Sequence, residues 1–278
     1  MNILDGKVVR KSILENIKEE LKDIDKPLGL AVISVGEDEA SKVYIRQKEK
    51  MAKELGYNFK HYKFDSDVEE KTILRLIDVL NINSGIDGIL VQMPLPEHLD
   101  SNIIQNRIDF KKDVDGLTDI NAGKLIHNKD CLIPCTPLGI IEILKYYDVN
   151  IDGANIVVVG RSNLVGKPLS NLLINHNATV TLCHSHTKNL KNITKNADIL
   201  IAAIGKPNFI TSDMIKDNAV IIDVGINRVD DKLCGDVDYN NVKGKVKYIT
   251  PVPGGVGQMT VAMLGYNVKK AHTLRKKR

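Results

Sequence analysis

The chain has 278 residues, of which 43% are hydrophobic and 27% are charged, and its formal net charge is +4. This length suits two domains of about 100 to 150 residues each, and the longest purely apolar runs, such as 199–204, are far too short to span a membrane. The densest basic run, 274–278, is expected to be a solvated helix end. Nucleic-acid binding is not expected, because the chain has no Trp and only 4% aromatic residues to stack on bases.

The N-terminus, MNILDGKVVRKS, has an early acid and no apolar segment typical of a secretory signal. Four scattered cysteines are too few for a disulfide framework in a chain of this size. We therefore expect a cytoplasmic protein with reduced thiols. A metal site is not expected at Cys183, His184 and His186, because alternate strand residues face opposite ways and no second ligand pair has zinc-site spacing.

Apolar runs of strand length alternate with helix-period segments along nearly the whole chain. This pattern is typical of parallel sheets covered by helices, so the predicted fold class is α/β. The predicted strands are 28–35, 57–64, 88–93, 155–159, 178–183, 199–204, 220–224 and 246–249. The predicted helices lie near 7–24, 40–55, 68–83, 137–147, 166–176, 189–196 and 256–274.

A domain boundary is predicted after the turn-rich stretch 113–116, because 121–123 and 133–137 then suggest an irregular connection into a new helix. The glycine-rich segment 253–257 is expected to mark the return of the chain toward the first domain. We therefore expect one domain over 1–118, joined by a C-terminal helix over 256–278. The second domain is expected over 119–255.

The strand 155–159 leads directly into a glycine turn, from Gly160 to Gly166, and then into a helix. This order is typical of a dinucleotide site on a Rossmann-type parallel sheet, where the first glycine makes the turn and the helix N-terminus offers N–H groups to a pyrophosphate. The motif departs from G-x-G-x-x-G, because Ser162 replaces the second glycine and the third comes one residue late. A plain strand-to-helix turn is the alternative.

At the end of the second strand, an NAD site usually places an acid that binds the ribose hydroxyls. Here that position reads His184-Ser185-His186. Without an acid, Arg161, Ser185 and a histidine are candidates to hold a 2′-phosphate, so NADP is favoured over NAD. The alternative is that Asp198 or Asp223 fills the acidic role from a different loop.

One lysine falls on the apolar face of the predicted helix 40–55. A rotation of about 100° per residue groups Lys48 with Tyr44, Met51, Ala52 and Leu55. Burial disfavours the charged form of an amine and lowers its pKa, and a lysine with a pKa near neutrality can act as a general acid or base. The alternative is that the Lys48 stem covers apolar surface while its ammonium reaches water.

Gln92 ends the buried strand 88–91, and the carboxyl ends of parallel strands are where open α/β sheets bind ligands. Its amide can accept a hydrogen bond from Lys48 and donate one to a substrate, although a strand-end amide can also simply face solvent. Asp113 and Asp115 flank a two-residue turn, where acids often bind backbone N–H groups. Only one of the two need be functional.

In this order, the motifs resemble those of the bifunctional methylenetetrahydrofolate dehydrogenase/cyclohydrolase (FolD) family, and the resemblance covers nearly the whole chain. Each motif alone is weak, but together they are highly specific. The motifs are 41–44 (SKVY) with Lys48, 88–96 (GILVQMPLP), 112–117 (KDVDGL), 133–137 (IPCTP), 159–162 (VGRS) with 165–168 (VGKP), 223–227 (DVGIN) and 250–257 (TPVPGGVG).

The resemblance implies roles for particular residues. Lys48 is the general acid/base of the cyclohydrolase step, Gln92 orients it, Tyr44 stacks on the aminobenzoyl ring, and Asp115 binds the pterin. The folate wall would comprise Val91, Gln92, Met93, Pro253, Gly254, Gly255, Val256 and Gly257. The NADP site would comprise Gly160, Arg161, Ser162, Ser185 and Ile226. One departure is Gln258, which follows the glycine-rich folate loop where the family usually has proline.

The implied enzyme is an NADP-dependent methylenetetrahydrofolate dehydrogenase that also hydrolyses methenyltetrahydrofolate to 10-formyltetrahydrofolate, in one-carbon metabolism. Hydride transfer needs alignment more than an acid or base, whereas hydrolysis is the step in which Lys48 matters. The resemblance also implies a homodimer with a small-molecule folate substrate. Two alternatives are a dehydrogenase without the hydrolase and a non-catalytic NADP-binding regulator.

Overall fold

The computed structural model describes residues 2–276 and divides into two compact units. The first, called here the six-stranded unit, comprises the chain up to Ser12 together with Thr136–Thr260. The second, called the three-stranded unit, comprises Ile13–Cys135 together with the chain from Val261. Among residues 2–276, no helix is both long and apolar enough to cross a membrane.

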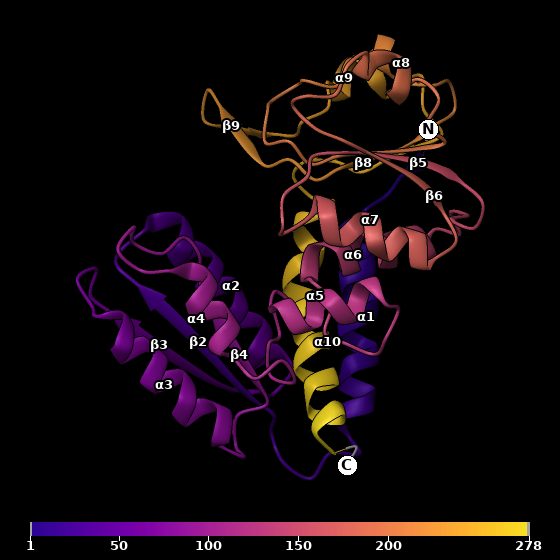
Figure 1. The fold of residues 1–278 in the computed structure, drawn as a ribbon. Coiled ribbons are helices and arrows are strands. Elements are labelled where there is room, and N and C mark those ends of the chain that lie inside the picture. The colour runs from indigo at the N-terminus through magenta and orange to yellow at the C-terminus, as the bar shows by residue number, and fades with distance from the viewer. Residues whose placement is uncertain (1, 277–278) are drawn as a thin grey trace. The chain divides into compact units, whose positions relative to one another are not determined.

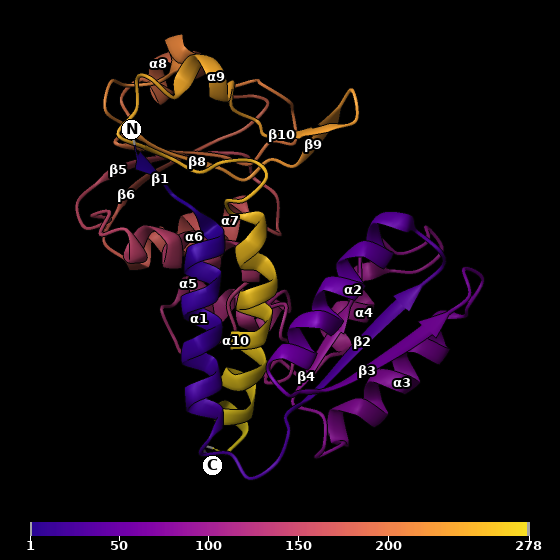
Figure 2. The same cartoon turned by 180° about the vertical axis from the view of Figure 1, so that it is seen from behind.

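The six-stranded unit is built on a parallel sheet (Figures 1 and 2). Within the described residues its order is β1 (Asn2–Ile3), β11 (Tyr248–Ile249), β8 (Val220–Asp223), β7 (Ile199–Ala202), β5 (Asn155–Val159) and β6 (Thr179–Cys183). The change of direction in strand order falls at β5, which is where α/β sheets of this kind bind ligands at their carboxyl edge.

Helices cover both faces of this sheet. The helices α6 (Cys135–Tyr146) and α7 (Gly166–Asn175) lie on one face, and α8 (Leu190–Thr194) and α9 (Tyr239–Val242) lie on the other (Figure 1). A short 3₁₀ helix spans Ser212–Met214, and an antiparallel hairpin of β9 (Asn227–Val229) and β10 (Lys232–Cys234) extends from the sheet. The central strands β5, β7 and β8 are mostly buried runs of β-branched and aliphatic residues, as expected for parallel sheet covered on both sides.

The three-stranded unit has the parallel order β3 (Asn58–Phe64), β2 (Gly29–Val35) and β4 (Gly88–Val91). Its central strand is buried along its whole length. The helices α3 (Glu70–Ile82) and α4 (Ser101–Arg107) pack on one face through Ile73, Ile77 and Ile104. The helices α2 (Glu39–Glu54) and α5 (Asp119–Ile126) complete the unit, together with those parts of α1 (Gly6–Leu21) and α10 (Gly257–Lys276) that belong to it.

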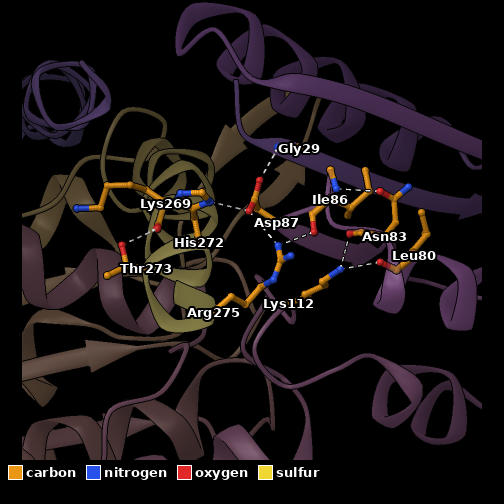
Figure 3. Close-up of polar contacts among 11 residues, drawn as sticks. Gly29, Leu80, Asn83, Ile86, Asp87, Lys112, Lys269, His272, Thr273 and Arg275 are labelled. Carbon is orange, nitrogen blue, oxygen red and sulfur yellow. Dashed lines mark hydrogen bonds and ion pairs between the residues drawn. The ribbon is translucent and has the colours of Figure 1, made fainter. Parts of the chain in front are cut away.

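A buried ionic cluster fastens α10 to the start of β4 (Figure 3). The carboxylate of Asp87 is 5% exposed. It accepts hydrogen bonds from the Gly29 N–H at 2.9 Å and from Arg275 Nη1 at 2.9 Å, and it contacts His272 Nδ1 at 2.8 Å. The basic run was expected to be a solvated helix end, but Arg275 contradicts this because it binds the buried Asp87. Lys277 and Arg278 of that run lie outside the described residues.

The α/β class is confirmed, and each of the eight predicted strands is present with small changes at its ends. The irregular connection expected at 121–123 was wrong, because these residues lie in α5. That helix is stabilised at its start by Thr118, whose hydroxyl accepts from the Asn121 N–H. The helix α4 was not predicted, and at its start Asp100 accepts from the N–H groups of Asn102 and Ile103.

The compact units differ from the expected domain ranges in three places. The segment 119–135 belongs with the three-stranded unit, the chain up to Ser12 belongs with the six-stranded unit, and so do residues 256–260. The second difference has a simple cause, because β1 pairs in register with β11 at the edge of the larger sheet. The expected packing of the C-terminal helix on the first domain agrees with the hydrogen bond from Tyr57 Oη to the Gly265 carbonyl.

Candidate active site

Lys48 lies in the middle of α2, whose first turn is fixed by Asp38. The Asp38 carboxylate accepts from the Ser41 N–H at 2.7 Å, as an N-cap residue does. Toward the C-terminal end of the helix, Met51 and Ala52 are fully buried, whereas the Tyr44 ring is 41% exposed. The predicted apolar face is thus buried only on the C-terminal side of Lys48. The lysine itself is half-buried and lies between the buried and the exposed parts of this face.

The contact expected between Lys48 and Gln92 is present. The Lys48 ammonium donates to Gln92 Oε1 at 2.7 Å. Gln92 directly follows β4, and its amide nitrogen donates to the Met93 carbonyl at 2.7 Å, which fixes the amide oxygen toward the lysine. The same carbonyl accepts from Ser41 Oγ at 3.3 Å. The first turn of α2 and the end of β4 are therefore held together around the lysine.

The two aspartates of the 113–116 turn have different surroundings. Asp113 is fully buried, and its carboxylate accepts from the N–H groups of Gly116 and Thr118 and from the side-chain amides of Gln105 and Asn121. It has the backbone-binding role that acids often take in turns. Asp115 is half-buried and lies within electrostatic reach of Lys48. Only Asp115 is therefore available for a ligand.

Burial dominates the electrostatics around Lys48. It lowers the pKa of the lysine below its ordinary value of 10.5, although the negative charge of Asp115 opposes this shift. Burial likewise raises the pKa of Asp115, and the positive charge of Lys48 opposes that shift. Both shifts disfavour the charged forms, so Lys48 loses its proton more readily than an exposed lysine does.

Two residues near this pair were missed in the sequence. The Cys135 thiol is buried, and burial together with the charge of Asp115 raises its pKa well above the ordinary value. Asn267 of α10 is fully buried, and its amide nitrogen donates to the carbonyls of Val114 at 2.9 Å and Ile133 at 2.8 Å. Asn267 thereby fixes the backbone beside Asp115. A single asparagine on a long helix gave no sequence signal for this contact.

The glycine turn of the six-stranded unit has the geometry that the sequence predicted. Gly160 follows β5 with a φ of +124°, and a methyl group there would collide with the Ala203 carbonyl. Gly166 starts α7, and a methyl group there would collide with the Gly160 carbonyl. The Ser162 hydroxyl accepts from the Val165 N–H at 3.2 Å. The turn is therefore closely packed, and α7 directs its N-terminus toward the turn.

No acid is available at the end of β6 to bind ribose hydroxyls. Arg161, just after β5, and Ser185, just after β6, are both exposed. Asp198 instead binds Lys216 and the Asn155 N–H, and Asp223 is buried and accepts backbone N–H groups. Neither therefore fills the acidic role that was the alternative to an NADP site. Within residues 2–276, no group of three His, Cys, Asp or Glu residues is placed to hold a metal.

The segment Pro253–Gly257 belongs to the six-stranded unit, where the Gly254 carbonyl accepts from the Gly6 N–H at 2.9 Å. Val256 is buried, and a methyl group on Gly257 would come within 3.2 Å of Ile226, a half-exposed side chain. Gln258 donates its N–H to the Gly255 carbonyl at 3.1 Å, so the loop is closed without proline. The role of Pro253–Gly257 in a folate wall stays a prediction.

These features define a two-unit α/β protein with a dinucleotide turn in one unit and a half-buried acid–base pair in the other. Comparison with known proteins identifies the family. The family model of the tetrahydrofolate dehydrogenase/cyclohydrolase catalytic domain matches residues 4–115, and that of the tetrahydrofolate dehydrogenase/cyclohydrolase NAD(P)-binding domain matches residues 134–276. The chain belongs to the tetrahydrofolate dehydrogenase/cyclohydrolase family.

Individual relatives agree over the full length. The bifunctional protein FolD of Campylobacter concisus is 54% identical over 268 residues, covering 95% of each chain. The crystal structure of the bifunctional FolD enzyme of Campylobacter jejuni is 42% identical with a TM-score of 0.96, covering 99% of each chain. The Trypanosoma brucei enzyme, solved with NADP and an inhibitor, is 33% identical with a TM-score of 0.93, covering 99% of this chain and 98% of that one. The family predicted from the sequence motifs is confirmed.

Proposed function

We propose that this chain oxidises methylenetetrahydrofolate to methenyltetrahydrofolate with NADP, and then hydrolyses the product to 10-formyltetrahydrofolate. The family supports both activities. The observation that carries the hydrolytic half is the half-buried Lys48, bonded to Gln92 and electrostatically paired with Asp115. This arrangement argues against a dehydrogenase without hydrolase activity.

The residues of the six-stranded unit fit a dinucleotide phosphate. Its glycine turn packs so closely that only glycines fit at 160 and 166, and the N-terminus of α7 can bind a pyrophosphate. Gly160, Arg161 and Ser162 would hold the phosphates, Ser185 with Arg161 the 2′-phosphate, and Ile226 would also contact the cofactor. When bound, NADP supplies the hydride acceptor. The NADP in the Trypanosoma brucei structure supports this choice over NAD.

In the three-stranded unit, the oxidation step needs a fixed folate rather than an acid or base. We assign the stacking of the aminobenzoyl ring to Tyr44, which is exposed one helical turn from Lys48. Val91, Gln92 and Met93 would line the folate at the end of β4, and Asp115 would bind the pterin. The lone pair of a folate nitrogen then drives hydride departure, so no side chain has to titrate.

The hydrolysis step uses the lysine. A water molecule attacks the methenyl carbon of the cation, and neutral Lys48 accepts the proton that the water loses. Gln92 Oε1 accepts a hydrogen bond from the resulting ammonium and holds it in place. The ammonium then returns the proton to the folate nitrogen as its bond to the carbon breaks, and the hydroxyl proton leaves to solvent as the carbon–oxygen double bond forms. The formyl group remains on the other nitrogen, and the lysine is regenerated.

The reaction and the cofactor are tested together by adding methylenetetrahydrofolate to the purified protein with NADP or with NAD. Reduced-cofactor absorbance is expected with NADP, and it is expected to be weaker with NAD. An absence of signal with either cofactor would leave a non-catalytic NADP-binding protein and refute the proposal. Loss of methenyl absorbance after adding methenyltetrahydrofolate alone measures the hydrolase.

We also infer that the protein is a cytoplasmic homodimer. The family resemblance supports the dimer, and the four unpaired cysteines support a reducing compartment. Light scattering is expected to give about twice the chain mass of 30.8 kDa. A single-chain mass at micromolar concentration would refute the dimer, and fractionation of the source cells tests the compartment.

A further inference from the structure

A buried carboxylate organises the loops at the carboxyl edge of the six-stranded sheet. Asp236 is fully buried, just after β10. Its carboxylate accepts from three consecutive backbone N–H groups, those of Ile204 at 2.6 Å, Gly205 at 3.0 Å and Lys206 at 2.9 Å. Three successive N–H groups form the concave site that commonly binds an anion. Here the protein supplies the anion itself.

The same carboxylate holds a second loop. Asn227 donates its side-chain amide to Asp236 Oδ1 at 2.9 Å. All four donors are therefore neutral, and the negative charge is stabilised by aligned dipoles rather than by a cation. Because both oxygens accept two hydrogen bonds, an asparagine at this position would leave an N–H group facing another N–H group.

Both loops touch residues proposed for the dinucleotide. The first loop begins at Ala203, whose carbonyl lies against Gly160 so closely that the glycine cannot carry a side chain. The second loop contains Ile226, which precedes Asn227 and is half exposed. Asp236 thus joins the loop that packs against the glycine turn to the loop that contains Ile226, a predicted NADP contact.

A second buried carboxylate fixes Asp236 itself. Asp223, at the end of β8, accepts from the backbone N–H groups of Asp236 at 2.9 Å and Val237 at 3.0 Å. Two glycines make room for this pair, because a methyl group on Gly225 would collide with the Asp236 carboxylate and one on Gly235 with that of Asp223. The DVGIN motif is therefore shaped by the packing of the two carboxylates.

We propose that Asp236 is a positioning residue for the dehydrogenase step, holding the 203–206 and 225–227 loops in the conformation that binds NADP. It touches neither substrate nor reacting atoms in this assignment, which rests on the proposed function. Because Asp236 and Lys48 belong to different compact units, its loss is expected to affect NADP use and not hydrolysis.

The test is Asp236→Asn in the full-length protein, assayed for both activities. Breaking hydrogen bonds to a buried carboxylate is expected to raise the KM for NADP by roughly ten-fold or more. Hydrolysis of methenyltetrahydrofolate without NADP and the KM for the folate are expected to stay within about two-fold of wild type, as the separation of the units implies. The matched control is Asp231→Asn, at a fully exposed hairpin position, which is expected to change neither activity.

A wild-type KM for NADP in Asp236→Asn would overturn the inference, and so would an equal fall of both activities in folded protein. If Asp236→Asn does not fold, Asn227→Ala decides the question. It removes one donor and leaves the three backbone contacts, so a smaller rise in the KM for NADP is expected, and no rise would refute the positioning role. An inactive wild type would instead refute the proposed function.

Discussion

The two compact units build their sites in different ways. The three-stranded unit places ionisable side chains, Lys48 and Asp115, where burial changes their pKa values. The six-stranded unit instead relies on backbone geometry, with glycines where no side chain fits and a buried carboxylate, Asp236, that holds N–H groups in place. Proton transfer needs a tuned side chain, whereas holding a dinucleotide needs a shaped backbone. One activity is therefore expected to be removable without the other.

The largest expected effect is on hydrolysis in Lys48→Met. Methionine keeps the length of the side chain but cannot carry a proton, and loss of a general acid/base typically costs about 10²- to 10⁴-fold in rate. Methenyltetrahydrofolate hydrolysis is therefore expected to fall to the uncatalysed rate. The measurement is the decay of methenyl absorbance with enzyme-free buffer subtracted, and hydrolysis at the wild-type rate would contradict the assigned role.

The next effect is expected from Gly160→Ala in the other unit. The methyl group would meet the Ala203 carbonyl at a backbone φ of +124° that alanine rarely adopts, so the turn must move. Dehydrogenase activity at fixed NADP is expected to fall by roughly a hundred-fold, at the upper end of the strain expected for such a residue. Gly153→Ala is the control, since it also has positive φ but open space around it. Loss of both activities in folded Gly160→Ala would contradict the expectation that one activity can be removed without the other.

A smaller effect is expected in the pH dependence of hydrolysis. Neutral Lys48 is the base, and burial lowers its pKa, so kcat is expected to rise with pH and level off below the ordinary lysine value of 10.5. Asp115→Asn removes the opposing charge, which is expected to move the rising limb to lower pH. A limb that stays at or above 10.5, or that moves upward in Asp115→Asn, would be inconsistent with this electrostatic arrangement.

The smallest effect concerns stability at Lys112. This side chain is 2% exposed and donates to the carbonyls of Leu80 and Asn83 (Figure 3), while burial lowers its pKa to about 8. The folded state thus disfavours the ammonium relative to the unfolded chain, so its contribution to stability is greatest above pH 10.5 and is lost as pH falls through about 8. The free energy of unfolding of wild type relative to Lys112→Met is expected to increase between these pH values. A constant difference would refute the linkage.

How much could be predicted from the sequence depended on the range of the interactions. Lys48 was found because helical period is local, and Gly160 because a strand, a turn and a helix are consecutive in the chain. Asn267 was not found, because its contacts with Val114 and Ile133 join residues more than a hundred positions apart. Asp236 also had no sequence signal, because its three backbone donors lie 30 to 32 positions away in the chain.

Some short elements also could not be predicted from the sequence. The strand β1 has two residues, and it exists because β11 offers it an edge. The helix α5 looked like a loop because its glycine and asparagine disfavour helix, yet Asn121 is held by Phe110 and Asp113 in the core. Tertiary contacts overrode local propensity in each case. The family could be identified from the sequence because its motifs are short runs of consecutive residues.

The most direct test of the central claim is NADPH formation by Lys48→Met supplied with methylenetetrahydrofolate and NADP. If the two units carry separable chemistry, NADPH appears at an initial rate close to wild type at saturating folate, and methenyltetrahydrofolate accumulates instead of 10-formyltetrahydrofolate. Formation of 10-formyltetrahydrofolate at the wild-type rate, or loss of NADPH formation together with hydrolysis in folded protein, would contradict it.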